Sequence, residues 1–281
     1  MQLFNTVETL RAHLSSLPEH KKLGFVPTMG ALHPGHASLV VQAITENEIV
    51  VVSIFVNPTQ FDNEKDLARY PKTLQADMAL LADISNEIVV FAPSTADIYQ
   101  NNIVAKKYDF EGLDKVMEGA FRDNHFNGVG TIVEALLKAV SPDRAYFGEK
   151  DFQQLLIIKK MVATQNLPVA IIGCPIVREK TGLAMSSRNE RLSKTMRKKA
   201  AFIYKTLKAS KKRFGTKSAK KTIQWVDKQF RNHPLLELEY FEITDTESLT
   251  PIIKKIENKK YRAFIVVYAE GVRLIDNIAL N

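Results

Sequence analysis

Two histidines in a glycine-rich turn have the clearest capacity for chemistry. The turn reads Pro27-Thr28-Met29-Gly30-Ala31-Leu32-His33-Pro34-Gly35-His36. It joins an expected strand to an expected helix, whose N-terminus offers N–H groups and a positive dipole end to an anion. The glycines let the backbone approach a phosphate closely. His33 and His36 are three residues apart, so both imidazoles can face the same phosphates and stabilise charge as pyrophosphate leaves. The alternative is a plain turn with incidental histidines.

Two neutral amides follow another apolar run, which ends in Phe55-Val56. The Asn57-Pro58 pair must end this strand, because proline cannot donate to a sheet ladder. Asn57 and Gln60 are therefore expected at the carboxyl edge of the sheet. Amides there can bind the hydroxyl and carboxylate groups of a small polar acid without neutralising a nucleophile. Asn-Pro could equally serve only to mark a turn.

A lysine stands at a third strand-to-helix junction, Phe147-Gly148-Glu149-Lys150-Asp151-Phe152-Gln153-Gln154. Asp151 is expected to cap the helix. Lys150 is expected to project at the substrate crevice as a point charge for a phosphate. Gln154 lies about one helical turn beyond the cap and can share that face. The alternative is an ordinary Asp-capped helix with a flanking ion pair.

A fourth segment carries two hydroxyls and a guanidinium in Leu183-Ala184-Met185-Ser186-Ser187-Arg188-Asn189. Arg188 offers planar donors that suit phosphate oxygens. We expect the segment to lie in an interdomain loop that suits triphosphate binding, and it resembles a mobile loop that closes over ATP in adenylyl-transferring enzymes. Closure would exclude water and protect a reactive mixed anhydride.

The four segments need a scaffold, and the first part of the chain supplies alternating strands and helices. The expected strands lack period-two alternation, as strands buried on both faces should. They are Leu23–Val26, Ile49–Val56, Ile88–Phe91, Ala145–Phe147 and Val169–Ile172. The expected helices are His36–Thr45, Thr73–Ala82, Thr131–Val140 and Phe152–Thr164. This alternation predicts an α/β fold with a doubly wound, Rossmann-like parallel sheet.

The C-terminal part predicts a smaller α+β domain, because helices precede strands there. Its expected helices are Thr195–Ser210 and Lys217–Phe230, and its expected strands are Leu236–Ile243, Arg262–Tyr268 and Val272–Ile275. We therefore expect a catalytic domain over residues 1–178 and a smaller domain over residues 179–281 that closes over the site.

Composition narrows the class of protein. The chain has 281 residues, of which 45% are hydrophobic and 25% charged, as in an ordinary globular protein. Its apolar runs are too short to cross a bilayer, and its start lacks a signal pattern. Cys174 is the only cysteine, so it cannot form an internal disulfide, and we expect a small core residue in a cytoplasmic protein.

The positive charge is concentrated in one stretch. The formal net charge is +8, and the chain from Lys194 to Lys221 carries twelve Lys or Arg and no Asp or Glu. We expect these basic side chains to lie on solvated helix faces, and their charge would also attract ATP locally. A patch for nucleic acid or phosphates is the alternative. No regularly spaced aromatics are interleaved for stacking on bases, which favours the first interpretation.

The His-x-Gly-His pattern resembles the signature of a superfamily that attacks the α-phosphate of a nucleotide and expels pyrophosphate. This superfamily includes class I aminoacyl-tRNA synthetases and small nucleotidyltransferases. Taken together and in order, the four segments resemble the pantothenate synthetase family over nearly the whole chain. Further matching stretches are Ala68-Arg69-Tyr70-Pro71, Phe91-Ala92-Pro93, Glu118-Gly119, His125-Phe126, Gly128-Val129 and Arg273-Leu274-Ile275-Asp276-Asn277.

The resemblance implies an ATP-dependent ligase that joins pantoate to β-alanine through a pantoyl-adenylate, releasing pyrophosphate and then AMP. It also implies magnesium with ATP and a homodimer formed through the first domain. His36 would be the proton donor, and His33, Lys150 and Arg188 would neutralise charge with it. ATP contacts would come from Met29, Gly30, Ala31, Leu32, His33, Pro34, Gly35, His36, Gly148, Glu149, Lys150, Asp151, Val177, Met185, Ser186, Ser187 and Arg188. Pantoate would be held by Gln60 and Gln154, with Asn57 at the same edge, and Gln60 would also lie near β-alanine.

Three alternatives remain open. A nucleotidylyltransferase with a phosphate acceptor would need a second cationic pocket in place of the amides. The basic C-terminal part could belong to an RNA-binding protein with a vestigial ATP fold, although we expect no nucleic-acid and no membrane partner. The third alternative is a noncatalytic nucleotide sensor.

Overall fold

The computed structural model describes all of the chain except residues 19, 62–66, 69, 101 and 253. The chain divides into two compact units. Unit 1 comprises Met1–Glu149 and Gln153–Pro175, and unit 2 comprises Lys150–Phe152 and Ile176–Asn281. No helix in the described part is both long enough and apolar enough to span a membrane.

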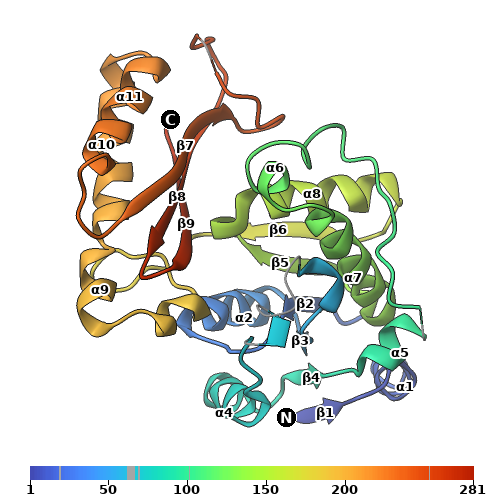
Figure 1. Ribbon diagram of the computed structural model, residues 1–281. Coiled ribbons are helices and arrows are strands. Elements are labelled where there is room, and N and C mark those ends of the chain that lie inside the picture. Colours follow the sequence, from blue (N-terminus) through green and yellow to red (C-terminus); the bar gives the residue numbers. More distant parts are fainter. Residues whose placement is uncertain (19, 62–66, 69, 101, 253) are drawn as a thin grey trace. The chain divides into compact units, whose positions relative to one another are not determined.

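Unit 1 is built on a six-stranded sheet with the order β1-β4-β3-β2-β5-β6 (Figure 1). All of its strand pairs are parallel. The strands are β1 (Gln2–Phe4), β2 (Leu23–Thr28), β3 (Ile49–Ile54), β4 (Val89–Phe91), β5 (Arg144–Gly148) and β6 (Ala170–Cys174). The predicted doubly wound parallel sheet is confirmed.

Helices and 3-10 turns connect these strands. The helices are α1 (Val7–Ser15), α2 (Pro34–Glu46), α4 (Leu74–Ile84), α5 (Thr95–Tyr99), α6 (Glu118–Phe121), α7 (His125–Val140) and α8 (Phe152–Thr164). The 3-10 turns are η1 (Pro58–Gln60) and η2 (Glu149–Asp151).

Both faces of the sheet are buried, because successive strand residues point to opposite sides. On one face, Val26 and Val52 pack with Val40 of α2 and Leu81 of α4 in one apolar cluster. On the other face, the fully buried Phe25 alternates with Val26. Helix α7 contacts β2 and packs on α1. Burial on both faces accounts for the apolar runs in the sequence.

The sheet has a topological switch point between β2 and β5. From β2 the chain builds outward through β3 and β4, whereas β5 and β6 lie on the other side of β2. In open α/β sheets, ligands bind beyond the carboxyl ends of the strands at such a point. The segments after Thr28 and Gly148 are therefore the place in unit 1 where a ligand is expected.

Unit 2 contains an antiparallel sheet of β7 (Glu237–Asp245), β8 (Tyr261–Ala269) and β9 (Val272–Ala279). Its helical elements are η3 (Ser187–Arg191), α9 (Lys194–Lys199), α10 (Phe202–Thr216) and α11 (Ala219–Phe230). The predicted smaller α+β part is confirmed. The helix expected over Thr195–Ser210 is wrong as a single element, since it breaks after Lys199. Met196 and Ile203, on either side of the break, enter the same apolar cluster.

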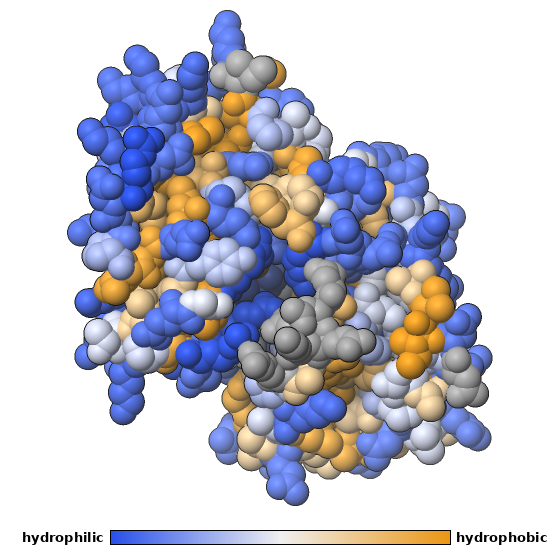
Figure 2. All heavy atoms as spheres, viewed as in Figure 1, coloured by the Kyte–Doolittle hydropathy of each residue, from blue (hydrophilic) through white to orange (hydrophobic). Residues whose placement is uncertain are grey.

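The basic stretch forms α9, α10 and α11. Nine of its twelve Lys and Arg side chains are exposed, as solvated helix faces require. Apolar residues such as Leu207 and Val226 occupy the buried sides of α10 and α11. Figure 2 shows hydrophilic residues gathered over these two helices. The alternative role as an anion patch stays a prediction.

Candidate active site

The turn after β2 is held in an unusual backbone conformation. Gly30 and Ala31 have φ of 79° and 50°, two successive left-handed residues. Such a conformation costs an alanine on the order of 1–3 kcal/mol unless its surroundings impose it. Here the buried carboxylate of Asp77 on α4 accepts from the N–H groups of Ala31 (3.1 Å) and Leu32 (2.7 Å). A buried acid from a different element thus fixes the turn that leads into α2.

The two histidines of the turn lie together at the N-terminus of α2. His33 is the N-cap, and its Nδ1 accepts from the N–H of Gly35 at 3.1 Å. The Nδ1 of His36 accepts from the N–H of His33 at 3.3 Å, and the two ring centroids are 4.0 Å apart. Because each Nδ1 is an acceptor, Nε2 carries the proton in each neutral imidazole. Two N–H donors therefore belong to one helix N-terminus, an arrangement suited to phosphate oxygens.

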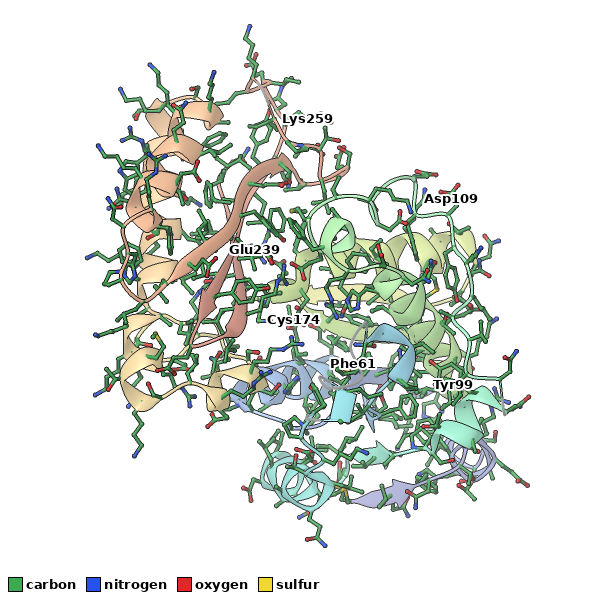
Figure 3. The ribbon with its side chains drawn as sticks, in the orientation of Figure 1. Phe61, Tyr99, Asp109, Cys174, Glu239 and Lys259 are labelled. Carbon is green, nitrogen blue, oxygen red and sulfur yellow. The ribbon has the colours of Figure 1, made fainter. Side chains whose placement is uncertain are left out.

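Asn57, which follows β3, is fully engaged within the protein. Its side chain is buried, and its amide nitrogen donates to Gln60 Oε1 and to the carbonyl of Gly128, each at 3.1 Å. Its oxygen accepts from the hydroxyls of Tyr99 and Thr59; Tyr99 is labelled in Figure 3. An amide has two donors and two acceptor sites, so Asn57 has its capacity filled and orients Gln60. Direct binding of an acid by Asn57 stays a prediction.

Gln60 is fixed through both its side chain and its backbone. Its Nε2 lies 3.1 Å from Met29 Sδ, so the segments after β2 and β3 meet. Its carbonyl is 2.8 Å from His125 Nδ1. Arg122 Nη1 is 3.0 Å from His125 Nε2. Since a guanidinium can only donate, Nε2 is the acceptor and Nδ1–H donates to Gln60.

Helix α7 begins earlier than predicted, and its first turn passes close to Thr59 and Gln60. The expected start was Thr131, and the observed start is His125. A Cβ at Gly128 would lie 2.2 Å from the carbonyl oxygen of Thr59, so only glycine fits there. Gly128 is therefore a contact residue and does not interrupt the helix.

The junction after β5 differs from the predicted capped helix. Turn η2 runs directly into α8, so the prediction that Asp151 is a separate N-cap is wrong. The Asp151 carboxylate instead lies 3.4 Å from Lys150 Nζ. Gln154 lies in the first turn of α8 in unit 1, and its neighbour Gln153 is buried. The Gln153 amide donates to the carbonyls of Leu113 and Val116.

The segment with two serines belongs to unit 2 and is ordered by its own hydrogen bonds. Ser186 is the N-cap of η3, and its Oγ accepts from the N–H of Arg188 at 3.3 Å. The carbonyl of Val177 accepts from the N–H of Met185 at 3.0 Å, which pairs the chain before and after residue 182. Asn189 is buried, and its amide donates to Glu179.

Each unit contains some of the predicted site residues. Unit 1 contains Met29, Gly30, Ala31, Leu32, His33, Pro34, Gly35, His36, Asn57, Gln60, Gly148, Glu149 and Gln154. Unit 2 contains Lys150, Asp151, Val177, Met185, Ser186, Ser187 and Arg188. Their roles in binding and catalysis stay predictions. Sequence reasoning missed four supporting residues: Asp77, Tyr99, His125 as the partner of Gln60, and Gln153.

Two further features lie outside this set. Cys174 is buried at the end of β6 (Figure 3), and burial raises the pKa of its thiol to about 11, as befits an unreactive core residue.

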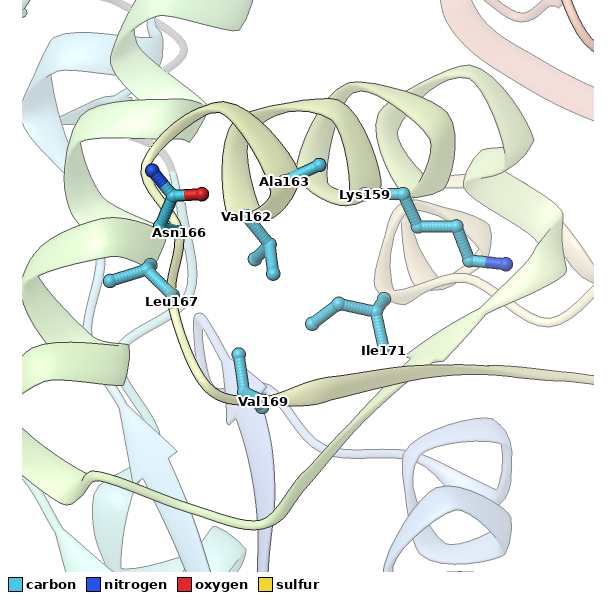
Figure 4. Close-up of a pocket in the computed structure, with 7 residues that line it drawn as sticks. All are labelled: Lys159, Val162, Ala163, Asn166, Leu167, Val169 and Ile171. Atoms are coloured by element: carbon cyan, nitrogen blue, oxygen red, sulfur yellow. The ribbon is translucent and has the colours of Figure 1, made fainter.

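A mostly apolar surface pocket lies beside α8 and β6 (Figure 4) and is lined by Lys159, Val162, Ala163, Asn166, Leu167, Val169 and Ile171. No predicted site residue lines it. Within the described ranges, no three His, Cys, Asp or Glu side chains are grouped to hold a metal ion.

A parallel sheet with a histidine-capped helix N-terminus beside its switch point defines a nucleotide-binding class of α/β protein. The family model for pantoate-beta-alanine ligase matches residues 2–279. The pantothenate synthetases of Christiangramia forsetii and Flavobacterium psychrophilum are 54% and 50% identical to this chain, each over the full length of both chains. The chain therefore belongs to the pantoate-beta-alanine ligase family.

Solved structures agree with this assignment. The crystal structure of pantothenate synthetase from Thermus thermophilus matches with a TM-score of 0.91 and 40% identity, covering 100% of this chain and 99% of the other. A Francisella tularensis pantoate-beta-alanine ligase, complexed with beta-gamma ATP and beta-alanine, matches with a TM-score of 0.80 and 35% identity, covering 100% and 98%. The match extends through both units.

Proposed function

We propose that this chain joins pantoate to β-alanine at the expense of ATP, giving pantothenate, AMP and pyrophosphate. The pantoate carboxylate attacks the α-phosphorus of ATP in line, pyrophosphate leaves, and the amine of β-alanine then displaces AMP from the acyl carbon. Positioning and charge stabilisation dominate such transfers. Family membership over the whole chain and the likeness to a ligase complexed with beta-alanine support this reaction.

The paired imidazoles of His33 and His36 carry the nucleotide part of the proposal. Their proton-bearing Nε2 atoms and the N-terminus of α2 suit the phosphates of ATP. His36 donates the proton, and Lys150 and Arg188 add charge. The ATP contacts are those predicted from the sequence, including the backbone near Val177 for the adenine. Magnesium would be held by phosphate oxygens of the nucleotide and by water, which are its usual ligands, and would neutralise part of the phosphate charge.

The acyl part of the proposal rests on Gln60. Its amide is held by Asn57 and its backbone by His125, so it presents a fixed neutral group beside Met29. Such an amide can bind the hydroxyl and carboxylate of pantoate without cancelling the carboxylate's charge. Gln154 shares this task, and Gln60 also lies near β-alanine. A mononucleotide acceptor would require cations where Gln60 stands, and this argues against the nucleotidylyltransferase alternative.

The proposal extends to assembly and location. We infer a homodimer formed through unit 1 and a cytoplasmic protein without nucleic-acid partners. The lone buried cysteine suits a reducing compartment. Light scattering at micromolar protein should give twice the chain mass of 31.7 kDa. A single-chain mass would contradict the dimer.

Isotope exchange tests the first half-reaction by itself. With pantoate but no β-alanine, labelled pyrophosphate should exchange into ATP, and no exchange should occur without pantoate. His36→Ala should slow the exchange about a hundredfold, the typical loss when a preorganised donor is removed. Exchange that is independent of pantoate, or requires a phosphorylated acceptor, would favour the nucleotidylyltransferase alternative.

A further inference from the structure

Three residues in the middle of the chain belong to unit 2, although the chain on both sides of them belongs to unit 1. Lys150–Phe152 form the end of η2 and the first residue of α8, yet they group with Ile176–Asn281. They include Lys150, the cation assigned above to the phosphates of ATP. Contacts within unit 2 therefore bear on where this lysine lies.

The side chain of Asn277 on β9 connects to both ends of this short segment. Its Nδ2 donates to the carbonyl oxygen of Lys150 at 2.9 Å. Its Oδ1 accepts from Arg262 Nη1 at 2.5 Å. The guanidinium of Arg262 lies over the ring of Phe152, 3.9 Å from the centroid. The segment is thus held at Lys150 by a hydrogen bond and at Phe152 by a cation–π contact.

Asn277 is itself rigidly placed. It is 1% exposed, and its backbone N–H donates to Asp276 Oδ1 at 2.7 Å. The Asp276 carboxylate forms a bidentate pair with Arg178, with distances of 2.6 and 2.8 Å. Arg178 in turn lies over the ring of Tyr204, 3.6 Å from the centroid. A buried polar network whose members are paired in this way holds a single geometry.

We propose that Asn277 is a positioning residue for Lys150, and that through it the C-terminal strand β9 determines where this lysine stands. The inference rests on the proposed role of Lys150 at the phosphates of ATP. It gives a function to the Asp276-Asn277 pair, which in the sequence is far from every residue assigned to a substrate. The side chain of Lys150 is only 20% exposed, so its surroundings confine it. A shift of its backbone would therefore move its ammonium group relative to the phosphates. A displacement of about 1 Å can cost up to a hundredfold in rate.

A double-mutant cycle on ATP binding tests the proposal. The variants are Asn277→Ala, Lys150→Ala and the double variant, titrated calorimetrically with magnesium and ATP. Asn277→Ala should weaken ATP binding about tenfold on the wild-type background, and should add little on the Lys150→Ala background, because its effect passes through the lysine. Equal losses on both backgrounds would overturn the proposal, because they would show that Asn277 acts without Lys150.

Two further variants separate positioning from simple loss of structure. Asn277→Asp keeps an oxygen for Arg262 but has no amide hydrogen for Lys150, so it should resemble Asn277→Ala; unchanged ATP affinity would contradict the proposal. Tyr268→Phe removes a 3.1 Å hydrogen bond to Glu239 in the same sheet and should leave ATP affinity unchanged. If Asn277→Ala does not fold, Asn277→Asp takes its place in the cycle.

The cycle also distinguishes this inference from the proposed function. If the wild-type chain makes pantothenate and the two losses are additive, only the inference fails. If the cycle shows coupling but no pantothenate forms, the inference stands and the proposed reaction fails. If Lys150→Ala leaves ATP affinity unchanged, both the inference and the assignment of Lys150 are overturned.

Discussion

The carboxylate of Asp77 accepts a 2.7 Å hydrogen bond from the backbone N–H of Leu32, 45 residues earlier in the chain. The same carboxylate accepts from Ala31, whose φ of 50° is unfavourable for an alanine. A buried acid on α4 therefore stabilises the turn that presents His33 and His36.

Removing this acid should loosen the turn. Asp77→Ala leaves two backbone N–H groups without their acceptor, at about 1–3 kcal/mol for each that stays buried. We expect a lower free energy of unfolding in urea and weaker ATP binding by calorimetry. Asp83→Ala, on an exposed position of the same helix, is the control. Unchanged ATP affinity in a folded Asp77→Ala variant would show that the turn does not depend on Asp77.

Gln60→Ala should affect pantoate and spare ATP. Removing the amide leaves a substrate hydroxyl or carboxylate unpaired, at roughly 1–3 kcal/mol. The Michaelis constant for pantoate should therefore rise about tenfold or more, while calorimetric ATP affinity stays close to wild type. Gln42→Ala, which removes an exposed amide on α2, is the matched control. If ATP affinity collapses while the pantoate dependence is unchanged, Gln60 is not part of the acyl pocket.

Gly128 should be intolerant of even one methyl group. An added Cβ would lie 2.2 Å from the carbonyl oxygen of Thr59, so Gly128→Ala must push η1 and Gln60 away from α7. We expect a loss of stability of about 1–3 kcal/mol and a raised Michaelis constant for pantoate. At Gly215 in α10 an added Cβ meets nothing within 4 Å, so Gly215→Ala should be neutral or stabilising by up to about 1 kcal/mol. Equal stability of the two variants would contradict the contact.

Glu134 on α7 should make stability depend on acidic pH. Burial by itself would raise the pKa of Glu134, but hydrogen bonds from Lys138, Tyr108 and Lys106 lower it to about 2, from 4.5 in an unfolded chain. A depressed folded-state pKa adds stability above the unfolded value and loses it as pH falls toward the folded value. Unfolding free energy should therefore fall between roughly pH 5 and pH 2.

The charge-neutral variant isolates this contribution. Glu134→Gln should be less stable than wild type near neutral pH and should show a shallower decline through the acidic range. Glu257→Gln, at an exposed position, should keep the wild-type profile. Urea titrations at a series of pH values measure both quantities. Parallel profiles for wild type and Glu134→Gln would mean that the carboxylate is not protonated in this window.

The sequence predicted the sheet because its central strands are continuous apolar runs, as in Phe25-Val26 and Val50–Val52. The sequence did not predict β1 or α1. Strand β1 (Gln2–Phe4) is short and largely exposed, and α1 buries only Leu10, so neither has a clear apolar pattern. The break after Lys199 also had no signal, because neither Gly nor Pro stands there. Only the folded core explains that bend.

For the site, residue type and spacing were informative where chemistry requires particular groups. The two histidines were predicted from their spacing in a glycine-rich turn and Gln60 from its place after a strand end, and their roles stay predictions. Asp77 was not found, because an acid within an amphipathic helix usually faces solvent, and nothing local reveals its partner 45 residues away. Asn277 was missed as a partner of Lys150 for the same reason: the hydrogen bond spans 127 residues.

An oxygen-isotope experiment tests the central claim, formation of a pantoyl-adenylate, most directly. Pantoate with ¹⁸O in both carboxylate oxygens is incubated with the protein, ATP and β-alanine, and the products are analysed by mass spectrometry. One labelled oxygen should appear in the phosphate of AMP and the other in the amide carbonyl of pantothenate, because the carboxylate attacks phosphorus and the amine then attacks carbon. Unlabelled AMP, or formation of ADP and phosphate in its place, would contradict the account.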